Sequence, residues 1–416
     1  MRIAYLTQSY PPMISGAALA VEKLATAMAQ RGHQVLVIAA SDRTEPYQTY
    51  KDNLTVLRLK SIHNPMRAYQ RFMLFPHFAI LKALKKFQPD IIHAHEPLQT
   101  AWAGTTYARR HHIPITMTVH QLPAFAASYL PNMPTLRRYT ESLLWTYARW
   151  LIKQFAPVIT PSHTTSGLLT AFTGIQALTV SNGIDLQRFH PPLPSDVGTA
   201  TRIRLNLPSN IPIILHIGRL DKDKSVDKVI RAAAPAIRES EAQLLVVGDG
   251  CEKRSLMNLC QALGIAQRVH FTGVISDCQY LSEIYRAASI FITTSEVETQ
   301  GIVLLEAAAS GLPIVAVDAT CISEVVHDQV NGYLAKPGDS AGLSNRLVTL
   351  LNNPEKARMM GMDGRTLVEA HDVHRTWSLH EKLYQASVMK TKTRQVLKRG
   401  QRLGKRDLVK SRMGFK

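Results

Sequence analysis

Cysteine is scarce in this chain of 416 residues, and the few cysteines are not arranged in pairs. Cys251, Cys260, Cys278 and Cys321 are scattered and form no C-x-x-C motif, the spacing expected of many zinc sites and redox-active disulfides. The N-terminal stretch MRIAYLTQSYPP reaches a double proline after one short apolar run, so no signal peptide is expected. We therefore interpret the cysteines as reduced thiols in a cytosolic protein.

Long hydrophobic runs are also missing. No apolar stretch reaches the roughly 18 residues that would span a bilayer, so any contact with a membrane has to be peripheral. Hydrophobic residues nevertheless make up 45% of the chain, which is enough for two domains with a core each. Disorder is expected only in short segments.

Acidic residues are almost absent from the last 27 residues. Between Lys390 and Lys416, eleven Lys and Arg face a single acid, Asp407, so 11 − 1 = +10 of the net charge of +18 lies there. Such a tail is usually a solvated, disordered arm, and it could hold an anionic membrane surface or RNA. Phe415 is its only aromatic residue, and this shortage of groups for base stacking makes nucleic acid the less favoured partner.

What the sequence does contain is an alternation of short buried strands with helical segments. In the first half, strands are predicted over residues 3–8, 33–40, 90–95, 115–120 and 158–162, with a helix that ends at Gly32. A stretch rich in Pro, Ser and Asn, 186–210, is interpreted as a linker. A second series of strands follows over 212–220, 242–250, 269–274, 288–295 and 312–317. This α/β pattern predicts two doubly wound, Rossmann-like domains with parallel sheets whose carboxyl ends face a cleft.

Two loops of the second series carry residues suited to an anionic ligand. Arg219 and Lys224 follow a predicted strand directly, and their joint placement favours ligand binding over two unrelated surface charges. The stretch VVGDG supplies Gly248 and Gly250, but Lys253 occupies the place of a third dinucleotide-binding glycine. A lone G-x-G is weak support for an NAD site.

The segment SEVETQGIVLLEAAASGLPIVAV combines burial with two carboxylates. A strand precedes it and IVLLEAAAS favours a helix, so Gly301 is predicted at a helix N-terminus, where free N–H groups and the helix dipole suit a phosphate. Glu298 then lies in the loop before the helix and Glu306 about five residues inside it. The two carboxylates are expected to address two ends of one ligand.

Several linked motifs resemble those of the retaining GT-B glycosyltransferases of family four. They are GRLDKDK, the Glu298-x7-Glu306 pair around Gly301 and ASGLPIVAVDATCISEVVHDQVNGYLAKPGD, with YPPMISGA, TVHQ, VSNGID and HRTWSLHEKLYQ extending the resemblance over all but the tail. Ser15-Gly16-Ala17 stands where many members have paired glycines, and Thr299-Gln300 replaces the common Gly-Phe. The form Glu-Thr-Gln-Gly is similar to that of diacylglycerol glucosyltransferases.

The resemblance implies a GT-B fold and a site for a nucleotide-sugar donor, with UDP-glucose favoured. Catalytic roles are implied for His120, Glu298, Arg219 and Lys224. Donor contacts are implied for Gly16, Arg219, Lys224, Gly248, Val274, Glu298, Gly301, Ile302, Val303 and Glu306.

Within that set, the resemblance implies that Arg219 and Lys224 neutralise the diphosphate. It also implies that Glu306 holds the ribose hydroxyls and that Glu298 contacts the donor sugar. The loop around Val274 would flank the base, and His120 would lie near the reacting sugar. Two cations and a helix terminus can stabilise a departing diphosphate electrostatically, so no metal or other cofactor is expected.

Other residues concern the acceptor side and the membrane. His93 and His95 share one strand face without a third ligand at a metal-site spacing, so we expect no zinc site. His95 and Glu96 are instead expected to line the cleft near the acceptor. The segment 135–155 has an apolar stripe, Leu136, Leu143, Tyr147, Trp150 or Leu151, and Phe155, that would usually be core. Its Trp, Tyr and Arg content also suits a membrane interface, as does that of residues 64–87.

These inferences divide the chain into an acceptor-binding domain over 1–190, to which a helix over 372–389 returns, a nucleotide-sugar-binding domain over 191–371, and a basic tail over 390–416. The favoured function is hexosyl transfer, from UDP-glucose to a lipid such as diacylglycerol, at the inner face of the cell membrane. One alternative is a GDP-mannose-dependent mannosyltransferase acting on a phosphoinositide or a soluble acceptor. Another, from a different class, is a basic nucleic-acid-binding protein.

Overall fold

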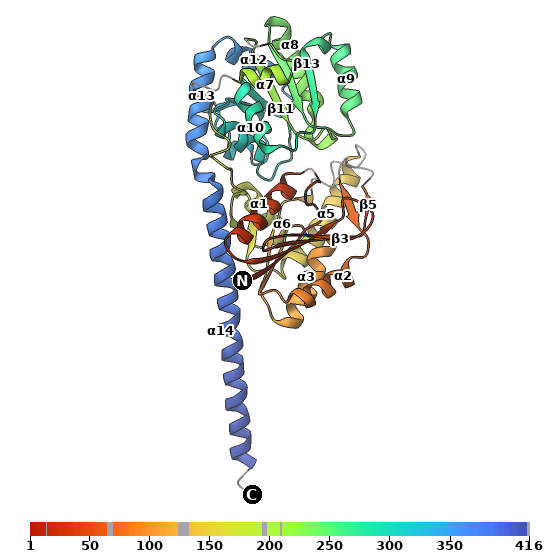
Figure 1. The fold of residues 1–416 in the computed structure, drawn as a ribbon, viewed down its shortest axis with the longest axis vertical. Coiled ribbons are helices and arrows are strands. Elements are labelled where there is room, and N and C mark those ends of the chain that lie inside the picture. The colour runs from red at the N-terminus through yellow and green to blue at the C-terminus, as the bar shows by residue number, and fades with distance from the viewer. Residues whose placement is uncertain (14, 65–69, 124–132, 194–197, 209, 414–416) are drawn as a thin grey trace.

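The computed structural model describes residues 1–13, 15–64, 70–123, 133–193, 198–208 and 210–413, and for residues 398–413 it describes the backbone alone. The strands of the described residues form two large sheets, one in each half of the chain, and the long helix α14 runs along the first half and projects beyond it (Figure 1). The two doubly wound α/β units predicted from the sequence are therefore present.

The first sheet is parallel except at one edge. Its strand order is β10-β9-β8-β7-β1-β2-β4-β3, and only the β3–β4 pair is antiparallel. The strands are β1 (Arg2–Leu6), β2 (Gln34–Ala40), β3 (Tyr47–Lys51), β4 (Leu54–Leu59), β7 (Ile91–Ala94), β8 (Ile115–Thr118), β9 (Val158–Thr160) and β10 (Leu178–Thr179). A separate pair consists of β5 (Ser61–His63) and β6 (Arg71–Met73). The helices are α1 (Gly16–Gln30), α2 (His77–Phe87), α3 (Gln99–His111), α5 (Pro134–Ile152) and α6 (His163–Thr173).

The second sheet is parallel throughout, in the order β13-β12-β11-β14-β15-β16. Its strands are β11 (Ile213–Ile217), β12 (Gln243–Val247), β13 (Val269–Gly273), β14 (Ile290–Thr293), β15 (Ile314–Val317) and β16 (Gly332–Ala335). The helices are α7 (Thr199–Arg204), α8 (Val226–Glu239), α9 (Lys253–Ala262), α10 (Cys278–Ala287), α11 (Ile302–Ala309), α12 (Ser340–Leu351) and α13 (Pro354–Leu367). Strands β14 and β15 are buried along their whole length, as expected for parallel strands covered by helices on both faces.

The chain crosses between the two halves twice, and the crossing segments are paired. The N–H of Ile184 donates to the carbonyl of His371 (2.8 Å), and the N–H of Val373 donates back to the carbonyl of Ile184 (3.0 Å). Gly183 has a φ of +79°, and a Cβ there would lie 2.8 Å from the Cα of Val373, so this close approach requires a glycine. We refer to residues 181–185 and 371–376 as the crossover segments.

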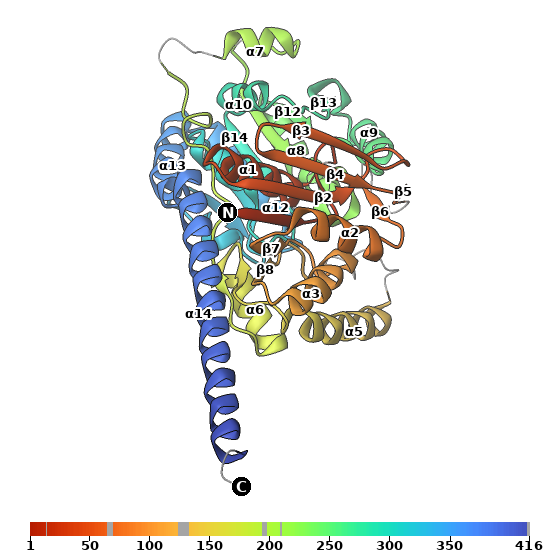
Figure 2. The same ribbon diagram turned by 60° about the horizontal axis from the view of Figure 1, so that its bottom comes forward.

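Helix α14 (Val373–Met413) corrects the expectation of a disordered tail, because the basic residues continue a helix that begins beside the first sheet. Near its start, Glu381 pairs with Arg31 (2.6 Å) and His33 (2.8 Å) of the first half. Farther on, the helix stands clear of both halves of the molecule (Figure 2). Lys and Arg are good helix formers, and extending an existing helix avoids the cost of nucleation.

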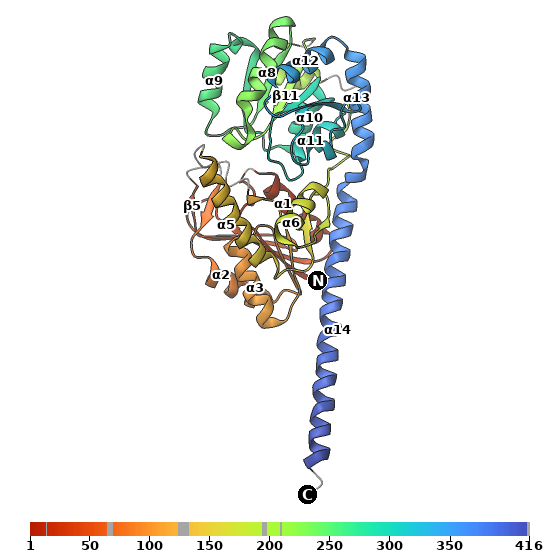
Figure 3. The ribbon, with the colours of Figure 1, turned by 180° about the vertical axis from the view of Figure 1, so that it is seen from behind.

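Two further expectations differ from the structure. The predicted linker 186–210 contains the short helix α7. The apolar stripe of α5, usually a core feature, is largely on the surface: Leu136, Leu143, Tyr147 and Trp150 are exposed, whereas Leu151 and Phe155 are buried. The helix lies along the outside of the first half, beside α6 (Figure 3).

Candidate active site

A polar cleft of about 110 Å³ lies where the two halves meet. Its walls come from loops that follow strands of both sheets and from the N-termini of α1 and α11. The residues that line it are Ser15, Gly16, Ala17, Gln70, His120, Gln121, Asn182, Arg219, Lys224, Glu298, Thr299, Gln300, Gly301 and Ile302. The structure thus brings together seven of the predicted site residues: Gly16, His120, Arg219, Lys224, Glu298, Gly301 and Ile302.

The N-terminus of α11 opens onto this cleft. Gly301 is its N-cap residue with a φ of +72°, and a Cβ there would lie 2.8 Å from the Cδ1 of Leu304. Across the cleft, a Cβ on Gly16 would approach the Cδ1 of Ile302 to 3.3 Å. Gly16 therefore leaves room for Ile302 at the start of α11, whereas Gly301 leaves room for Leu304 within its own helix. Unpaired N–H groups of a first helical turn suit a phosphate, and Val303 lies in the same turn as Ile302.

The charged residues of the cleft are held in ion pairs. Arg219 contacts Asp221 and lies 2.7 Å from the Oδ2 of Asp223, and all three side chains are buried. The Nζ of Lys224 lies 2.5 Å from the Oε1 of Glu298, which joins the loop after β11 to the loop after β14. These pairs fix two cations in the loop after β11, and the Lys224 pair reaches the loop that leads from β14 into α11.

Glu306 lies deeper than the cleft walls. It is buried in α11, and its Oε2 accepts a hydrogen bond from the hydroxyl of Tyr285 (2.9 Å). Burial raises the pKa of this carboxyl, and the charge of Lys23 on α1 partly opposes the rise. Glu306 is the fifth residue of α11 and, unlike Lys224 and Glu298, does not line the cleft.

Gly248 and Val274 also lie outside the cleft lining. The N–H of Gly248 donates to the carbonyl of Gly273 (2.9 Å), and a Cβ on Gly248 would fall 1.9 Å from the carbonyl oxygen of Gly218. Gly248 thus packs the loops after β11, β12 and β13 against one another, which is a sufficient structural reason for a glycine. Val274 follows Gly273 at the end of β13.

On the acceptor side, His120 belongs to a cluster of buried rings. Its Nε2 lies 3.1 Å from the Nδ1 of His95, and the two rings are stacked. His93 lies next to His95, with ring centroids 4.1 Å apart, and His380 of α14 lies 5.7 Å from His93. Burial lowers the pKa of all four histidines, to about 4 for His120 and His380, so they are neutral at pH 7.

Both ring nitrogens of His93 already have partners. Nδ1 is 2.6 Å from the hydroxyl of Tyr384, and Nε2 is 2.8 Å from the Oγ1 of Thr118. Tyr384 comes from α14 and also meets the hydroxyl of Tyr5 (3.2 Å). The returning helix therefore takes part in the hydrogen-bonded network behind His120.

Glu96 does not face the cleft. It is buried, and its carboxylate accepts hydrogen bonds from the hydroxyl of Thr7 (3.1 Å) and the backbone N–H of Gln8 (2.8 Å). Burial raises its pKa to about 7, and these hydrogen bonds partly oppose the rise. Glu96 thus ties the loop after β1 to the end of β7.

An apolar pocket of about 110 Å³ adjoins the polar cleft at Gln121, which lines both. Its other walls are Pro97, Leu98, Val119, Leu122, Pro123, Leu144, Trp145, Tyr147, Ala148, Ile152 and Leu169. Most of these residues come from α5 and from the loop after β8. The pocket therefore lies between the inner face of α5 and the loop that carries Gln121, with the exposed Tyr147 on its wall.

Several cleft residues were not predicted: Ser15, Ala17, Gln70, Gln121, Asn182, Thr299 and Gln300. Six of them stand in segments that the sequence motifs already mark: Ser15 and Ala17 in YPPMISGA, Gln121 in TVHQ, Asn182 in VSNGID, and Thr299 and Gln300 beside Gly301. Their position in or next to these motifs could have identified them as candidate site residues. Gln70 lies in no motif, and no sequence signal pointed to it.

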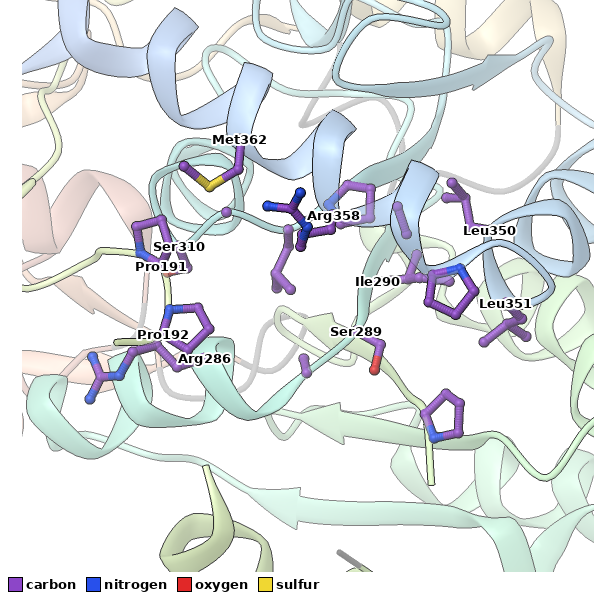
Figure 4. A pocket seen from close by; sticks show the side chains of 17 residues that line it. Pro191, Pro192, Arg286, Ser289, Ile290, Ser310, Leu350, Leu351, Arg358 and Met362 are labelled. Carbon is purple, nitrogen blue, oxygen red and sulfur yellow. The ribbon is translucent and has the colours of Figure 1, made fainter. Parts of the chain in front are cut away.

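A larger cavity of about 400 Å³ lies away from this cleft, where β14 and β15 begin (Figure 4). Prolines and aliphatic side chains form most of its wall, among them Pro191, Pro192, Leu350 and Met362. No predicted site residue lines it.

The class of the protein follows from comparison with known families. A model of the group 1 glycosyl transferases matches residues 199–367, and a model of glycosyltransferase family 4 matches residues 14–188. A GDP-mannose-dependent alpha-mannosyltransferase from Mycobacterium tuberculosis is 30% identical over 353 residues, which is 82% of this chain and 85% of that protein. The chain therefore belongs to the glycosyltransferases of family 4.

Other relatives and solved structures agree with this assignment. An alpha-monoglucosyldiacylglycerol synthase from Streptococcus pneumoniae is 28% identical over 80% of this chain and 75% of its own length. A sucrose-phosphate synthase from Thermosynechococcus elongatus superimposes with a TM-score of 0.78 at 24% identity, covering 93% of this chain and 98% of that one. The Anabaena protein HepE in complex with UDP-glucose gives a TM-score of 0.75 at 21% identity, with 93% and 100% coverage. The predicted GT-B fold is confirmed.

Proposed function

We propose that this glycosyltransferase moves a hexose, with glucose from UDP-glucose as the first choice, to a membrane lipid such as diacylglycerol, and that the anomeric configuration is retained. The observation that carries the proposal is the junction at Gln121, where a polar cleft with two cations meets an apolar pocket. A charged donor and an apolar acceptor need these two environments side by side. The streptococcal relative is named for the synthesis of a glucosyldiacylglycerol, which supports the same pairing.

On the donor side, we propose that the diphosphate binds between the N-terminus of α11 and the two cations. Arg219 and Lys224 would offset the negative charge that grows as the bond to the sugar breaks. Asp221 and Asp223 hold the guanidinium of Arg219 in place, so little reorganisation is needed when the donor arrives. With these groups the reaction requires no metal ion or other cofactor.

The sugar itself would lie between Glu298 and His120, which line the same cleft from opposite halves. Glu298 is held by Lys224, and His120 by His95, so both side chains have a fixed direction before a substrate binds. Such preorganisation keeps the reacting atoms aligned. Glu306 would receive the ribose hydroxyls behind the first turn of α11.

On the acceptor side, we propose that residues 1–190 with the helix 372–389 bind the lipid, and that residues 191–371 bind the donor. Leu143, Tyr147 and Trp150 expose apolar and aromatic surface on α5, with Arg137, Arg138, Arg149 and Lys153 in the same helix and its C-cap. Phe75, just before α2, and Phe78, in its first turn, are even more exposed. This combination suits insertion into the headgroup region at the inner face of the cell membrane.

The basic end of α14 adds a second means of attachment. Its cations would be drawn to an anionic bilayer, at roughly 1 kcal/mol for each Lys or Arg that reaches the surface. None of the helices described is both long and apolar enough to cross a bilayer. Attachment would therefore be peripheral, with nucleic acid a less favoured partner.

A second candidate is transfer of mannose from GDP-mannose to a phosphoinositide or a soluble acceptor. The mycobacterial mannosyltransferase, 30% identical to this chain, favours it. The two candidates separate in a screen of nucleotide-sugars for thermal stabilisation, followed by supply of acceptors to the best donor. Stabilisation by UDP-glucose and labelling of diacylglycerol would support the first proposal, whereas stabilisation by GDP-mannose alone would replace it with the second.

A further inference from the structure

Thr299 and Gln300, which stand in place of the common Gly-Phe, bind the donor loop to the other half of the molecule. The hydroxyl of Thr299 donates to the backbone carbonyl of His120 (3.2 Å). The carbonyl of Thr299 accepts from the hydroxyl of Thr165 (3.0 Å), which is buried at the start of α6. Both contacts run from the second half of the chain to the first.

Gln300 reaches a different target, the crossover segment over 181–185. Its Oε1 accepts from the backbone N–H of Asn182 (2.9 Å), and its Nε2 donates to the Oγ of Ser181 (2.6 Å). Ser181 in turn meets the Nδ1 of His371 (3.0 Å) in the other crossover segment. Gln300 is 3% exposed, so its amide is satisfied by protein groups at the place where the two halves are connected.

The same two residues lie between two parts of the proposed donor site, Glu298 and Gly301. Glu298, which holds Lys224, precedes Thr299 directly, and Gly301, the N-cap of α11, follows Gln300. His120 is thereby held twice, at its ring by His95 and at its carbonyl by Thr299. A Gly-Phe pair could make none of the side-chain hydrogen bonds of Thr299 and Gln300, because it has neither a hydroxyl nor an amide.

We propose that Thr299 and Gln300 form an interdomain latch whose hydrogen bonds to His120, Ser181 and Asn182 hold Glu298 and Lys224 in register with His120. The two are positioning residues, since they act through groups that would touch the substrate. An unpaired buried amide is costly, so the latch favours the arrangement in which the cleft is assembled. The benefit for turnover rests on the proposed function, but the latch itself can be tested without turnover.

The structural test follows the amide hydrogen exchange of Asn182 in the full-length protein. Gln300→Leu removes the acceptor of that N–H while keeping a side chain of similar size. We expect exchange at Asn182 to become faster by at least fivefold, the equivalent of one ordinary hydrogen bond. The N–H of Gly248, bound within the second half by the carbonyl of Gly273 (2.9 Å), provides the internal reference and should keep its rate.

The functional test compares Thr299→Val with Thr299→Ser. The valine variant is nearly isosteric and loses the hydroxyl, so kcat should fall about fivefold, the equivalent of one neutral hydrogen bond, while KM for the donor and UDP affinity change less than twofold. The serine variant keeps the hydroxyl and should restore kcat.

Unchanged exchange at Asn182 in Gln300→Leu would overturn the latch, even if no acceptor for the enzyme were found. Equal losses of kcat, UDP affinity and thermal stability in Thr299→Val and Thr299→Ser would also overturn it, because they would indicate packing alone. Failure of the enzyme to label any lipid, with faster exchange at Asn182, would count against the proposed acceptor and leave the latch supported.

Discussion

The two sides of the cleft differ in the charge of the side chains that form them. The donor side consists of charges held in pairs, Arg219 with two aspartates and Lys224 with Glu298. The acceptor side, behind His120, consists of neutral buried rings. The difference indicates that one side is prepared to receive a dianionic diphosphate and the other to exclude charge. Substitutions on either side of the cleft test this difference.

The largest effect is expected on the donor side. Lys224→Ala should lower kcat by about 10²-fold, because the charge on a departing diphosphate grows in the transition state. The affinity for the donor should fall much less. Steady-state kinetics with calorimetry of UDP binding would separate the two quantities.

Lys222 provides the matched control for that change. It lies in the same short 3-10 helix, η1 (Lys222–Lys224), but is exposed, so Lys222→Ala should leave kcat unchanged. A loss of donor affinity with kcat unchanged in Lys224→Ala would place its charge in ground-state binding only.

The next effect concerns the exposed face of α5. Leu143 and Trp150 are 53% and 55% exposed, so the double change Leu143→Ser and Trp150→Ser should remove apolar surface that enters the bilayer. At about 1 kcal/mol for each side chain, binding to vesicles should weaken about 30-fold, equally at low and high salt. Removal of the chain after Met389 should instead weaken binding only at low salt, because exposed charges are screened beyond about 10 Å at 0.1 M.

Co-sedimentation with anionic vesicles across a salt series measures both changes. Ile203→Ser is the control, since Ile203 is even more exposed, at 66%, but lies on α7 in the second half of the chain. If full-length protein stayed in the supernatant even at low salt, the membrane proposal would fail and a soluble acceptor would become the better explanation.

A smaller effect is expected at Glu306. Its replacement by Gln should raise the dissociation constant of UDP about tenfold, because an amide keeps only part of the charge-assisted bonding to ribose hydroxyls, worth about 1.5–3 kcal/mol. Tyr285→Phe is the control, as it removes the existing hydroxyl partner and leaves the carboxylate. Unchanged UDP affinity in Glu306→Gln would remove this residue from the donor site.

The contribution of the acceptor side to the free energy of unfolding should depend on pH rather than on salt concentration. Because the pKa values of His93, His95, His120 and His380 lie below that of an unfolded histidine, the unfolded chain binds more protons as pH falls from about 6.5 to 4. The free energy of unfolding should therefore decrease over that range, by up to about 1.4 kcal/mol per pH unit for each histidine.

Glu96 opposes this trend. Its pKa of about 7 in the folded protein lies above its unfolded value, so its protonation stabilises the folded state as pH falls towards 4.5. Urea unfolding at pH 5 and 7 should still show lower stability at pH 5. His380→Phe should reduce the difference, while His63→Phe, at an exposed position, should not. A larger stability at pH 5 than at pH 7 would contradict the view of a neutral acceptor side.

The same contrast explains what could be predicted from the sequence. The donor side is compact in the chain: Glu298, Gly301 and Glu306 stand within one strand–loop–helix unit, so local rules placed Gly301 at the N-terminus of α11. The acceptor side is assembled from β7, β8 and α14, and only the folded chain brings His380 near His93. No local pattern could show that the ring of His95 contacts that of His120, or that Glu96 accepts hydrogen bonds from the loop after β1.

Strands and helices could likewise be predicted where the local sequence carries a clear signal. Buried parallel strands such as β11 and β14 are continuous apolar runs and were predicted. Strand β3 was missed because it is an edge strand with mostly exposed, polar side chains, YQTYK, and gives no apolar signal. The helical tail was missed because its composition is compatible with both disorder and helix, and the packed start of α14 decides between them.

The central claim is that the polar cleft and the apolar pocket that meet at Gln121 form one reaction site. It is tested most directly by incubating the enzyme with UDP-[14C]glucose and either vesicles that contain diacylglycerol or glycerol in solution, which offers the same kind of hydroxyl without acyl chains. We predict that the label enters diacylglycerol and not glycerol. Equal labelling of glycerol, or no labelling of lipid while UDP-glucose binds, would contradict the claim.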